Sequence, residues 1–216
     1  PSCSAPSSCP SDDQAMTTQK PPPRAWQRML SGRRLDLLDP SPLDIEIEDI
    51  AHGLARVARW NGQTLGDHTF SVAQHTLIVE EIFSASHPNL DRDARRAALL
   101  HDAPEYVVGD LISPFKAAIG LDYKAFENRL LAAIHRRFGL PEVLAPELTQ
   151  KIKDADRTAA YFEATALAGF AHDEAERFFG KPNLTAVLTK KLTHLEARPL
   201  AEIQAAFLDQ FENLSE

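Results

Sequence analysis

Cysteine is scarce in this chain of 216 residues, which contains only 2. Cys3 and Cys9 both lie near the start of the sequence, so neither can crosslink a core formed by the remaining residues. A body without thiols fits a reducing compartment, and we expect a cytoplasmic protein. The same scarcity excludes a metal site built from thiolates, so any bound metal must be held by histidine and carboxylate side chains.

Long apolar runs and an excess of positive charge are also missing. No hydrophobic stretch approaches the length of a membrane span, and no basic segment followed by an apolar one opens the sequence, so we expect neither a membrane helix nor a secretory signal. Lysine and arginine number 23 against 31 for aspartate and glutamate, which gives a formal net charge of -8. Binding of a nucleic acid polymer needs clustered cations, so this balance argues against it while allowing a mononucleotide.

What the sequence does contain is a series of helical patterns separated by glycine and proline. Residues 1–23 are rich in serine and proline without periodicity, and we expect a disordered extension there. Residues 24–216 are predicted to form one all-α domain, because strand-like alternation is nearly absent apart from the short segment DIEIED. The predicted helices are a short one beginning at residue 26, then 47–60, 70–84, 91–100, 122–138, 146 to about 171, and 199–214.

Side chains that could bind a metal occur where a soluble helix usually carries an apolar residue. His75 lies in SVAQHTLIV, Asp156 lies in KIKDADRTAAYF, and His101 with Asp102 ends AALLHDAPE, where Pro104 limits continuation of the helix. A charged or imidazole side chain among core residues is costly unless it is paired, hydrogen-bonded or bound to a metal. Each of them alone is more often a satisfied polar residue, but together, on three separate helices, they predict a metal centre.

The predicted donor set indicates which cations would suit the site. Two imidazoles and two carboxylates with open positions can bind Mn, Co, Fe, Zn or Mg. Each of these ions can acidify a water molecule and polarise a phosphoryl oxygen, so a divalent metal cofactor and hydrolytic chemistry are expected.

The pattern resembles the HD-domain phosphohydrolase superfamily, and within it the bacterial HD-domain 5′-deoxynucleotidases and related bacterial and phage HD hydrolases. The likeness covers roughly residues 24–170. Its sharpest part, HDAPEYVVGDLISPFK, is similar to that group's HD-x-x-E-x-x-x-G-D-L-x-x-P-x-K stretch. The segments DIEIEDIAHGLARVARWNGQT and FSVAQHT are also similar to the group's sequence ahead of its site. This resemblance implies a single-domain HD-type helical bundle.

The resemblance also implies roles for individual residues. His75, His101, Asp102 and Asp156 would be the metal ligands. Glu105 would be the catalytic glutamate that handles the proton of the attacking water or of the leaving nucleoside oxygen. The three-residue step from Asp102 to Glu105 agrees with this role, because one helical turn would bring both to the same side. The alternative for Glu105 is an acid at a helix N-terminus that is stabilised by the helix dipole.

Further residues match positions that contact the substrate in the family. Arg59 would bind the substrate phosphate and assist catalysis, with Arg56, one turn earlier, as the alternative. Asp110 would read the sugar, or else serve as a turn residue after Gly109. Trp60 would stack on the base, or else pack at a helix end.

Some segments depart from the pattern of the best-known deoxynucleotidases. The loop between residues 60 and 75 carries an insertion, and residues 33–42 look like those of phage-type and alphaproteobacterial-type relatives. Lys116 and Lys153 match lysines of the family and are either phosphate contacts or solvated residues. Because these segments fall where the base and the phosphate chain would be sensed, the identity of the substrate is left open.

The function expected from the sequence is therefore metal-dependent hydrolysis of a small nucleotide. Release of phosphate from 5′-(deoxy)nucleoside monophosphates is the leading expectation. The alternatives are a deoxynucleoside triphosphate triphosphohydrolase and a non-catalytic nucleotide-binding HD module. The apolar face of residues 199–214 would either pack on the core or mediate a homodimer.

Overall fold

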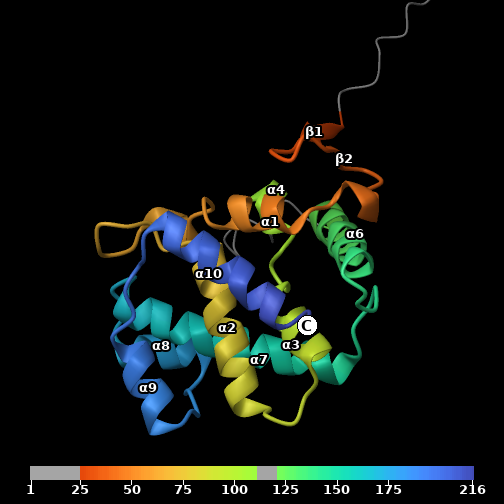
Figure 1. Ribbon diagram of the computed structural model, residues 1–216. Coiled ribbons are helices and arrows are strands. Elements are labelled where there is room, and N and C mark those ends of the chain that lie inside the picture. Colours follow the sequence, from red (N-terminus) through yellow and green to blue (C-terminus); the bar gives the residue numbers. More distant parts are fainter. Residues whose placement is uncertain (1–24, 111–120) are drawn as a thin grey trace, which may run out of the picture.

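Helices dominate the computed structural model, which describes residues 25–110 and 121–216. The extension predicted over residues 1–23 lies outside the described residues. The helical content confirms the predicted all-α class. Helix α2 passes through the middle of the molecule, where α10 lies across it and α7 crosses it (Figure 1). The helices are α1 (Ile47–Leu54), α2 (Val72–Ser86), α3 (Arg92–Leu99), α4 (Glu105–Val108), α6 (Leu121–Arg137), α7 (Pro146–Ala166), α8 (His172–Phe179), α9 (Ala186–Thr193) and α10 (Leu200–Asn213), with short 3-10 turns η1 (Pro42–Asp44) and η2 (Arg59–Gly62).

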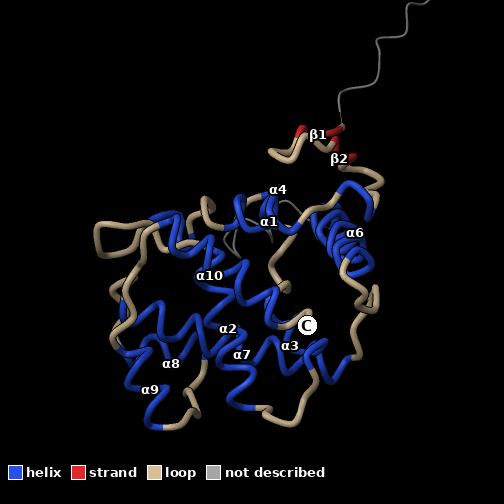
Figure 2. Tube along the Cα trace, viewed as in Figure 1, coloured by secondary structure: helices blue, strands red, loops and turns tan. Residues whose placement is uncertain are grey.

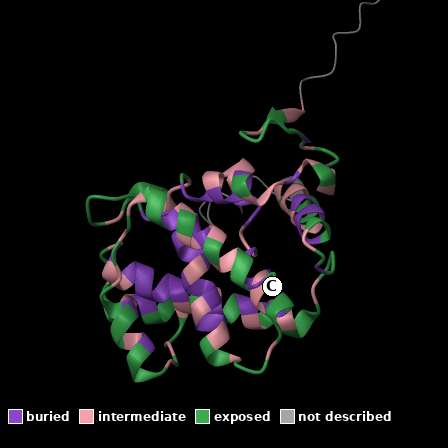
Figure 3. Cartoon of the chain, in the orientation of Figure 1, coloured by how far each residue is buried: buried purple, intermediate pink, exposed green. Residues whose placement is uncertain are grey.

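Helix α2 forms the centre of the core because other helices cover it on several sides. It packs against α3, α7 and α10, and much of it is buried (Figure 3). Val72, Val79 and Phe83 have no exposed surface, and neither does the imidazole-bearing His75. A polar ring at this depth requires partners from the helices that pack around it.

Helices α2 and α3 begin within two residues of their predicted starts, and each start is capped by a side chain. The Ser71 hydroxyl accepts a hydrogen bond from the backbone N–H of Gln74 and caps α2. The Asp91 carboxylate accepts one from the backbone N–H of Ala94, at 2.8 Å, and caps α3. Both side chains satisfy backbone donors that have no partner inside the helix.

The helix predicted to begin at Trp26 was wrong, because this segment forms a β-hairpin. Strand β1 (Trp26–Arg28) pairs antiparallel with β2 (Arg34–Asp36), and both lie at one end of the molecule (Figure 2). Only Leu35 is buried in β2, between two exposed charged residues, which is the alternation of a strand. Gly32 adopts a φ of 88° in the turn, where a residue with a side chain would be strained. The Asp49 carboxylate then accepts hydrogen bonds from the backbone N–H and the hydroxyl of Ser31 and ties the hairpin to α1.

Two predicted helices end earlier than expected. Helix α1 ends at Leu54 rather than near residue 60, where Trp60 and Asn61 have φ angles of 56° and 50° that cannot continue a right-handed helix. Helix α7 ends at Ala166 instead of residue 171, ahead of Gly169 at a φ of 77°. The segment after it forms α8 and α9, which the sequence did not predict.

The apolar face of α10 is used for packing within the chain. Ile203 and Phe207 are buried, and α10 contacts α1 and α2. This is the intramolecular use predicted for residues 199–214, and a homodimer stays a prediction. Across residues 25–110 and 121–216, no helix combines the length and apolar character needed to cross a membrane.

The close approach of α1 to α4 permits a stability prediction at Gly53. A Cβ atom at this position would lie 2.7 Å from Tyr106 Cβ and 3.0 Å from the Tyr106 carbonyl oxygen. In an unhindered helix, glycine to alanine stabilises by up to about 1 kcal/mol. Here we expect Gly53→Ala to lower the free energy of unfolding by about 1–3 kcal/mol, because α4 must shift. Urea denaturation would measure this change, with the half-buried His52→Ala as a control expected to change by less than about 0.5 kcal/mol. A variant more stable than the wild type would contradict the close packing.

Candidate metal centre

Two imidazoles from different helices face each other inside the protein. His75 is one turn into α2, and His101 follows the end of α3. Their ring centroids are 5.4 Å apart. The Nδ1 atom of each ring is engaged, that of His75 by a Glu163 oxygen at 2.5 Å and that of His101 by the Ala98 carbonyl oxygen at 2.8 Å. The Nε2 atoms of both rings lie near one and the same oxygen of Asp102.

Two aspartates complete this cluster, as the sequence predicted. One Asp102 oxygen lies 3.4 Å from His75 Nε2 and 3.2 Å from His101 Nε2. An Asp156 oxygen, from α7, lies 3.2 Å from His75 Nε2. Ligand atoms of His75, His101 and Asp156 all fall within 4.8 Å of one another. The structure thus brings together all four predicted ligands, and their binding of a metal stays a prediction.

The donor set fits a divalent cation. Within the part of the chain that the structure describes, the buried Nε2 atoms of His75 and His101 form no hydrogen bond. Imidazole nitrogens so placed, with carboxylate oxygens between 3.2 and 3.4 Å away, are suitable metal ligands. A nitrogen and oxygen set of this kind accepts any of the predicted ions, so the identity of the metal is left open.

The electrostatics of the cluster also favour a cation. Burial opposes ionisation of Asp102, but the imidazoles of His101 and His75 lower its pKa well below the usual value. The pKa of Asp156 is lowered as well, with burial opposed mainly by His75. Burial and Arg59 both oppose protonation of His75, yet the surrounding carboxylates raise its pKa well above normal. Burial likewise opposes protonation of His101, and Asp102 raises its pKa. The carboxylates thus favour positive charge on the two imidazoles, and a bound cation would take the place of the imidazole protons.

Arg59 borders the carboxylates of the cluster. Its backbone N–H donates to the Phe70 carbonyl oxygen at 2.9 Å, just ahead of α2. Its NH1 atom lies 3.9 Å from an Asp102 oxygen and 3.8 Å from an Asp110 oxygen. Burial opposes the charge on Arg59, but Glu163 and the nearby aspartates raise its pKa. A permanently charged guanidinium thus lies beside the candidate metal ligands.

The structure distinguishes Arg59 from its alternatives. Arg56 is exposed and donates hydrogen bonds to the His52 carbonyl oxygen and the Gln204 side chain. Lys153 is exposed on α7, and Lys116 lies outside the described residues. Of the described cations that the sequence proposed, Arg59 is the one that contacts the cluster.

Trp60 follows Arg59 in a backbone conformation that is unusual for a residue with a side chain. Trp60 and Asn61 both have positive φ angles, each costing about 1–3 kcal/mol when it must be held by its surroundings. The Trp60 ring packs against Phe170 and Phe179, with centroids at 5.7 and 6.1 Å. Its Nε1–H donates to Glu163 at 3.0 Å. These contacts support the predicted packing role, and stacking of Trp60 on a base stays a prediction.

Glu105 lies one turn from the aspartate of the HD pair. Its backbone N–H donates to the Asp102 carbonyl oxygen at 3.0 Å, and it opens α4. The residue is 2% exposed. A buried position argues against the alternative of a solvated acid at a helix N-terminus.

Glu163 is a residue of the site that the sequence analysis missed. It lies two turns after Asp156 on α7 and has no exposed surface. It contacts His75, Arg59 and Trp60. The signal that would have found it is the one that identified Asp156, since Glu163 is an acid within the buried apolar run YFEATA.

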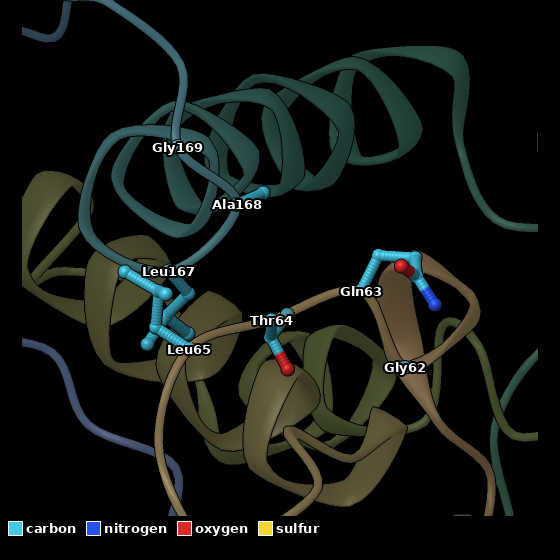
Figure 4. Close-up of a pocket in the computed structure, with 7 residues that line it drawn as sticks. All are labelled: Gly62, Gln63, Thr64, Leu65, Leu167, Ala168 and Gly169. Carbon is cyan, nitrogen blue, oxygen red and sulfur yellow. The ribbon is translucent and has the colours of Figure 1, made fainter.

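A separate hollow lies beside the turn that follows Trp60. It measures about 320 Å³ and is lined by residues 62–65 and 167–169 (Figure 4). The backbone N–H of Leu65 donates to the Leu167 carbonyl oxygen at 2.9 Å and joins the two segments. None of the candidate metal ligands lines this hollow.

Comparisons with known proteins agree with the resemblance noted in the sequence. The profile of a family described as 5′-deoxynucleotidase YfbR-like matches residues 51–212. An uncharacterized protein of Rhodobacter capsulatus is 60% identical over 184 residues, or 85% of this chain and 92% of that protein. The uncharacterized protein YfdR of Escherichia coli is 33% identical over 102 residues, or 47% of this chain and 52% of that protein.

Among solved structures, similarity is found to the HD phosphohydrolase DatZ of cyanophage S-2L bound to dA and one catalytic Zn²⁺ ion. The TM-score is 0.46 at 22% sequence identity, and the match covers 77% of this chain and 94% of that chain.

Proposed function

The chain belongs to the YfbR-like 5′-deoxynucleotidase family, and from this premise we propose that it releases inorganic phosphate from 5′-(deoxy)nucleoside monophosphates. The observation that carries the proposal is the convergence of His75, His101, Asp102 and Asp156 beside Arg59. Imidazole and carboxylate donors next to a guanidinium suit a phosphate ester, which needs its charge neutralised and a nucleophile delivered to phosphorus.

The predicted ligands would hold a divalent cation. When bound, such a cation acidifies a water molecule and polarises a phosphoryl oxygen. The remaining steps belong to side chains of the chain itself. Arg59 neutralises the phosphate through its fork of N–H donors. Glu105 takes the proton of the attacking water and can return it to the nucleoside oxygen that leaves.

A nucleotide panel tests the proposed function. We expect the metal-loaded protein to release phosphate from dAMP, dGMP, dCMP and TMP, and a 3′-phosphate such as 3′-AMP to serve as the positional control. Treatment with a chelator should abolish release, and added Mn²⁺, Co²⁺ or Zn²⁺ should restore it, because water is activated only with a cation in place. Phosphate and tripolyphosphate would be quantified separately for each nucleotide.

The same panel discriminates the alternatives. Release of tripolyphosphate from deoxynucleoside triphosphates would identify a triphosphohydrolase. The triphosphate chain of such a substrate carries more negative charge than one guanidinium can neutralise. Bound metal without turnover of any nucleotide would identify a binding module. Turnover that survives exhaustive chelation would contradict a metal-dependent reaction.

A further inference from the structure

The two oxygens of the Glu163 carboxylate have different partners. Oε1 lies 2.5 Å from His75 Nδ1, which belongs to α2. Oε2 accepts a hydrogen bond from Trp60 Nε1 at 3.0 Å and two from Arg59, at 3.2 and 3.4 Å. All of these donors lie at least 88 positions away in the sequence. One buried side chain therefore joins a candidate metal ligand to a candidate phosphate-binding residue.

The contact with Oε1 determines which nitrogen of His75 can bind a metal. When a carboxylate accepts a hydrogen bond from Nδ1–H, the ring adopts the tautomer whose Nε2 carries a lone pair. That Nε2 is the atom facing Asp102 and Asp156, at 3.4 and 3.2 Å. Partners of this kind also hold the plane of the ring and increase the basicity of the ligand.

The contacts with Oε2 determine the direction of the Arg59 fork. Its Nε and NH2 atoms are engaged by Glu163, and this leaves NH1 toward Asp102 and Asp110 at 3.9 and 3.8 Å. The third donor is the Nε1–H of Trp60, the residue that follows Arg59. This contact anchors Trp60, whose φ is 56°. A guanidinium held along one edge by a carboxylate presents its remaining N–H groups in a fixed direction.

We propose that Glu163 is a positioning residue that couples the metal ligand His75 to the phosphate-binding Arg59. Through Oε1 it sets the tautomer of the imidazole, and through Oε2 it aims the guanidinium. The role given to Arg59 rests on the proposed function, whereas the action on His75 does not depend on any turnover.

Substitution by glutamine tests the coupling, since Glu163→Gln keeps the size of the side chain but replaces one acceptor oxygen by an NH2 donor. Whichever way the amide faces, either His75 Nδ1–H or the Arg59 and Trp60 donors meet another donor. We expect the dissociation constant for Co²⁺, measured by calorimetry, to rise about 10- to 100-fold. Binding of inorganic phosphate to the Co²⁺-saturated protein should also weaken, by about tenfold.

A second buried carboxylate supplies the matched control. Glu80, on α2, is 4% exposed and is bonded to Ser84, Arg95 and Gln210. Glu80→Gln is expected to reduce thermal stability while leaving both dissociation constants within twofold of the wild type. Equal effects of the two substitutions on Co²⁺ binding, or wild-type Co²⁺ binding by Glu163→Gln, would overturn the proposal.

A measurement on the wild-type protein covers the case in which Glu163→Gln does not fold. In the Zn²⁺-loaded protein, ¹⁵N spectra of labelled histidine should show His75 with a proton on Nδ1 and a metal-shifted Nε2. The opposite tautomer would overturn the proposal. If the wild-type protein hydrolyses no nucleotide but Glu163→Gln still weakens both Co²⁺ and phosphate binding, the proposed function fails. The coupling of His75 to Arg59 then stands.

Discussion

Replacing His101 by alanine is expected to reduce nucleotide hydrolysis by about 1,000-fold or more, since a lost metal removes several kcal/mol of transition-state stabilisation. His101 contributes its Nε2 to the cluster, 3.2 Å from Asp102, and the Ala98 carbonyl oxygen engages its Nδ1. Alanine removes the imidazole nitrogen that would bind the metal. Metal content after gel filtration and the initial rate of phosphate release would measure the two effects.

His194 offers a control with a similar local contact. Its Nδ1 atom is bonded to the Lys190 carbonyl oxygen at 2.9 Å, within its own helical segment, but the residue is exposed. We expect His194→Ala to keep its metal and wild-type rates. Full activity in a well-folded His101→Ala protein would show that the metal centre does not take part in hydrolysis.

Replacing Glu105 by glutamine should separate catalysis from metal binding. The amide is nearly the same size but cannot accept a proton, so we expect turnover to fall by about 100- to 10,000-fold, the usual contribution of a general base. Glu105 is not among the predicted ligands, so the dissociation constant for the metal should change little. Steady-state kinetics and metal titration on the same preparation would establish this division.

Glu48→Gln tests the alternative reading of Glu105 as an acid that stabilises a helix N-terminus. Glu48 lies in the first turn of α1, as Glu105 does in α4, but it is exposed. A helix-dipole effect alone would cost either variant only about 0.3–1 kcal/mol of stability. We expect that small loss and normal turnover for Glu48→Gln, whereas similar turnover in both variants would assign Glu105 to stability.

The candidate ligands could be proposed from the sequence because four such residues occur together, although each alone is more often a satisfied polar residue. His75 and Asp156 interrupt apolar helical patterns, and the structure brings them to 3.2 Å of each other. Glu163 carries the same signal, because it is an acid among the apolar residues Tyr161, Phe162 and Ala164. The rule that buried charges need partners applies to Glu163 as it does to Asp156.

The elements that were predicted wrongly are those in which local patterns compete. Residues 26–36 contain few apolar side chains, and their hairpin is tied to α1 by the Ser31–Asp49 bonds. Helix α1 ends at Leu54 and the backbone is extended at Ala58, while Trp60, with its positive φ, contacts Phe170, Phe179 and Glu163. Contacts between distant residues override local preference at such positions.

The sequence by itself determined the all-α class, the approximate starts of α2 and α3, and which residues are proposed to bind a metal. These properties follow from periodicity, capping and the cost of burying a polar group, which act over a few neighbouring positions. Only the tertiary structure decided how the ligands are oriented and which guanidinium stands beside them. His75 and Glu163 are separated by 88 positions, and Arg59 and Glu163 by 104. No local pattern encodes such distances, because the packing of α2 on α7 brings Glu163 to His75, and Arg59 comes from the separate turn η2.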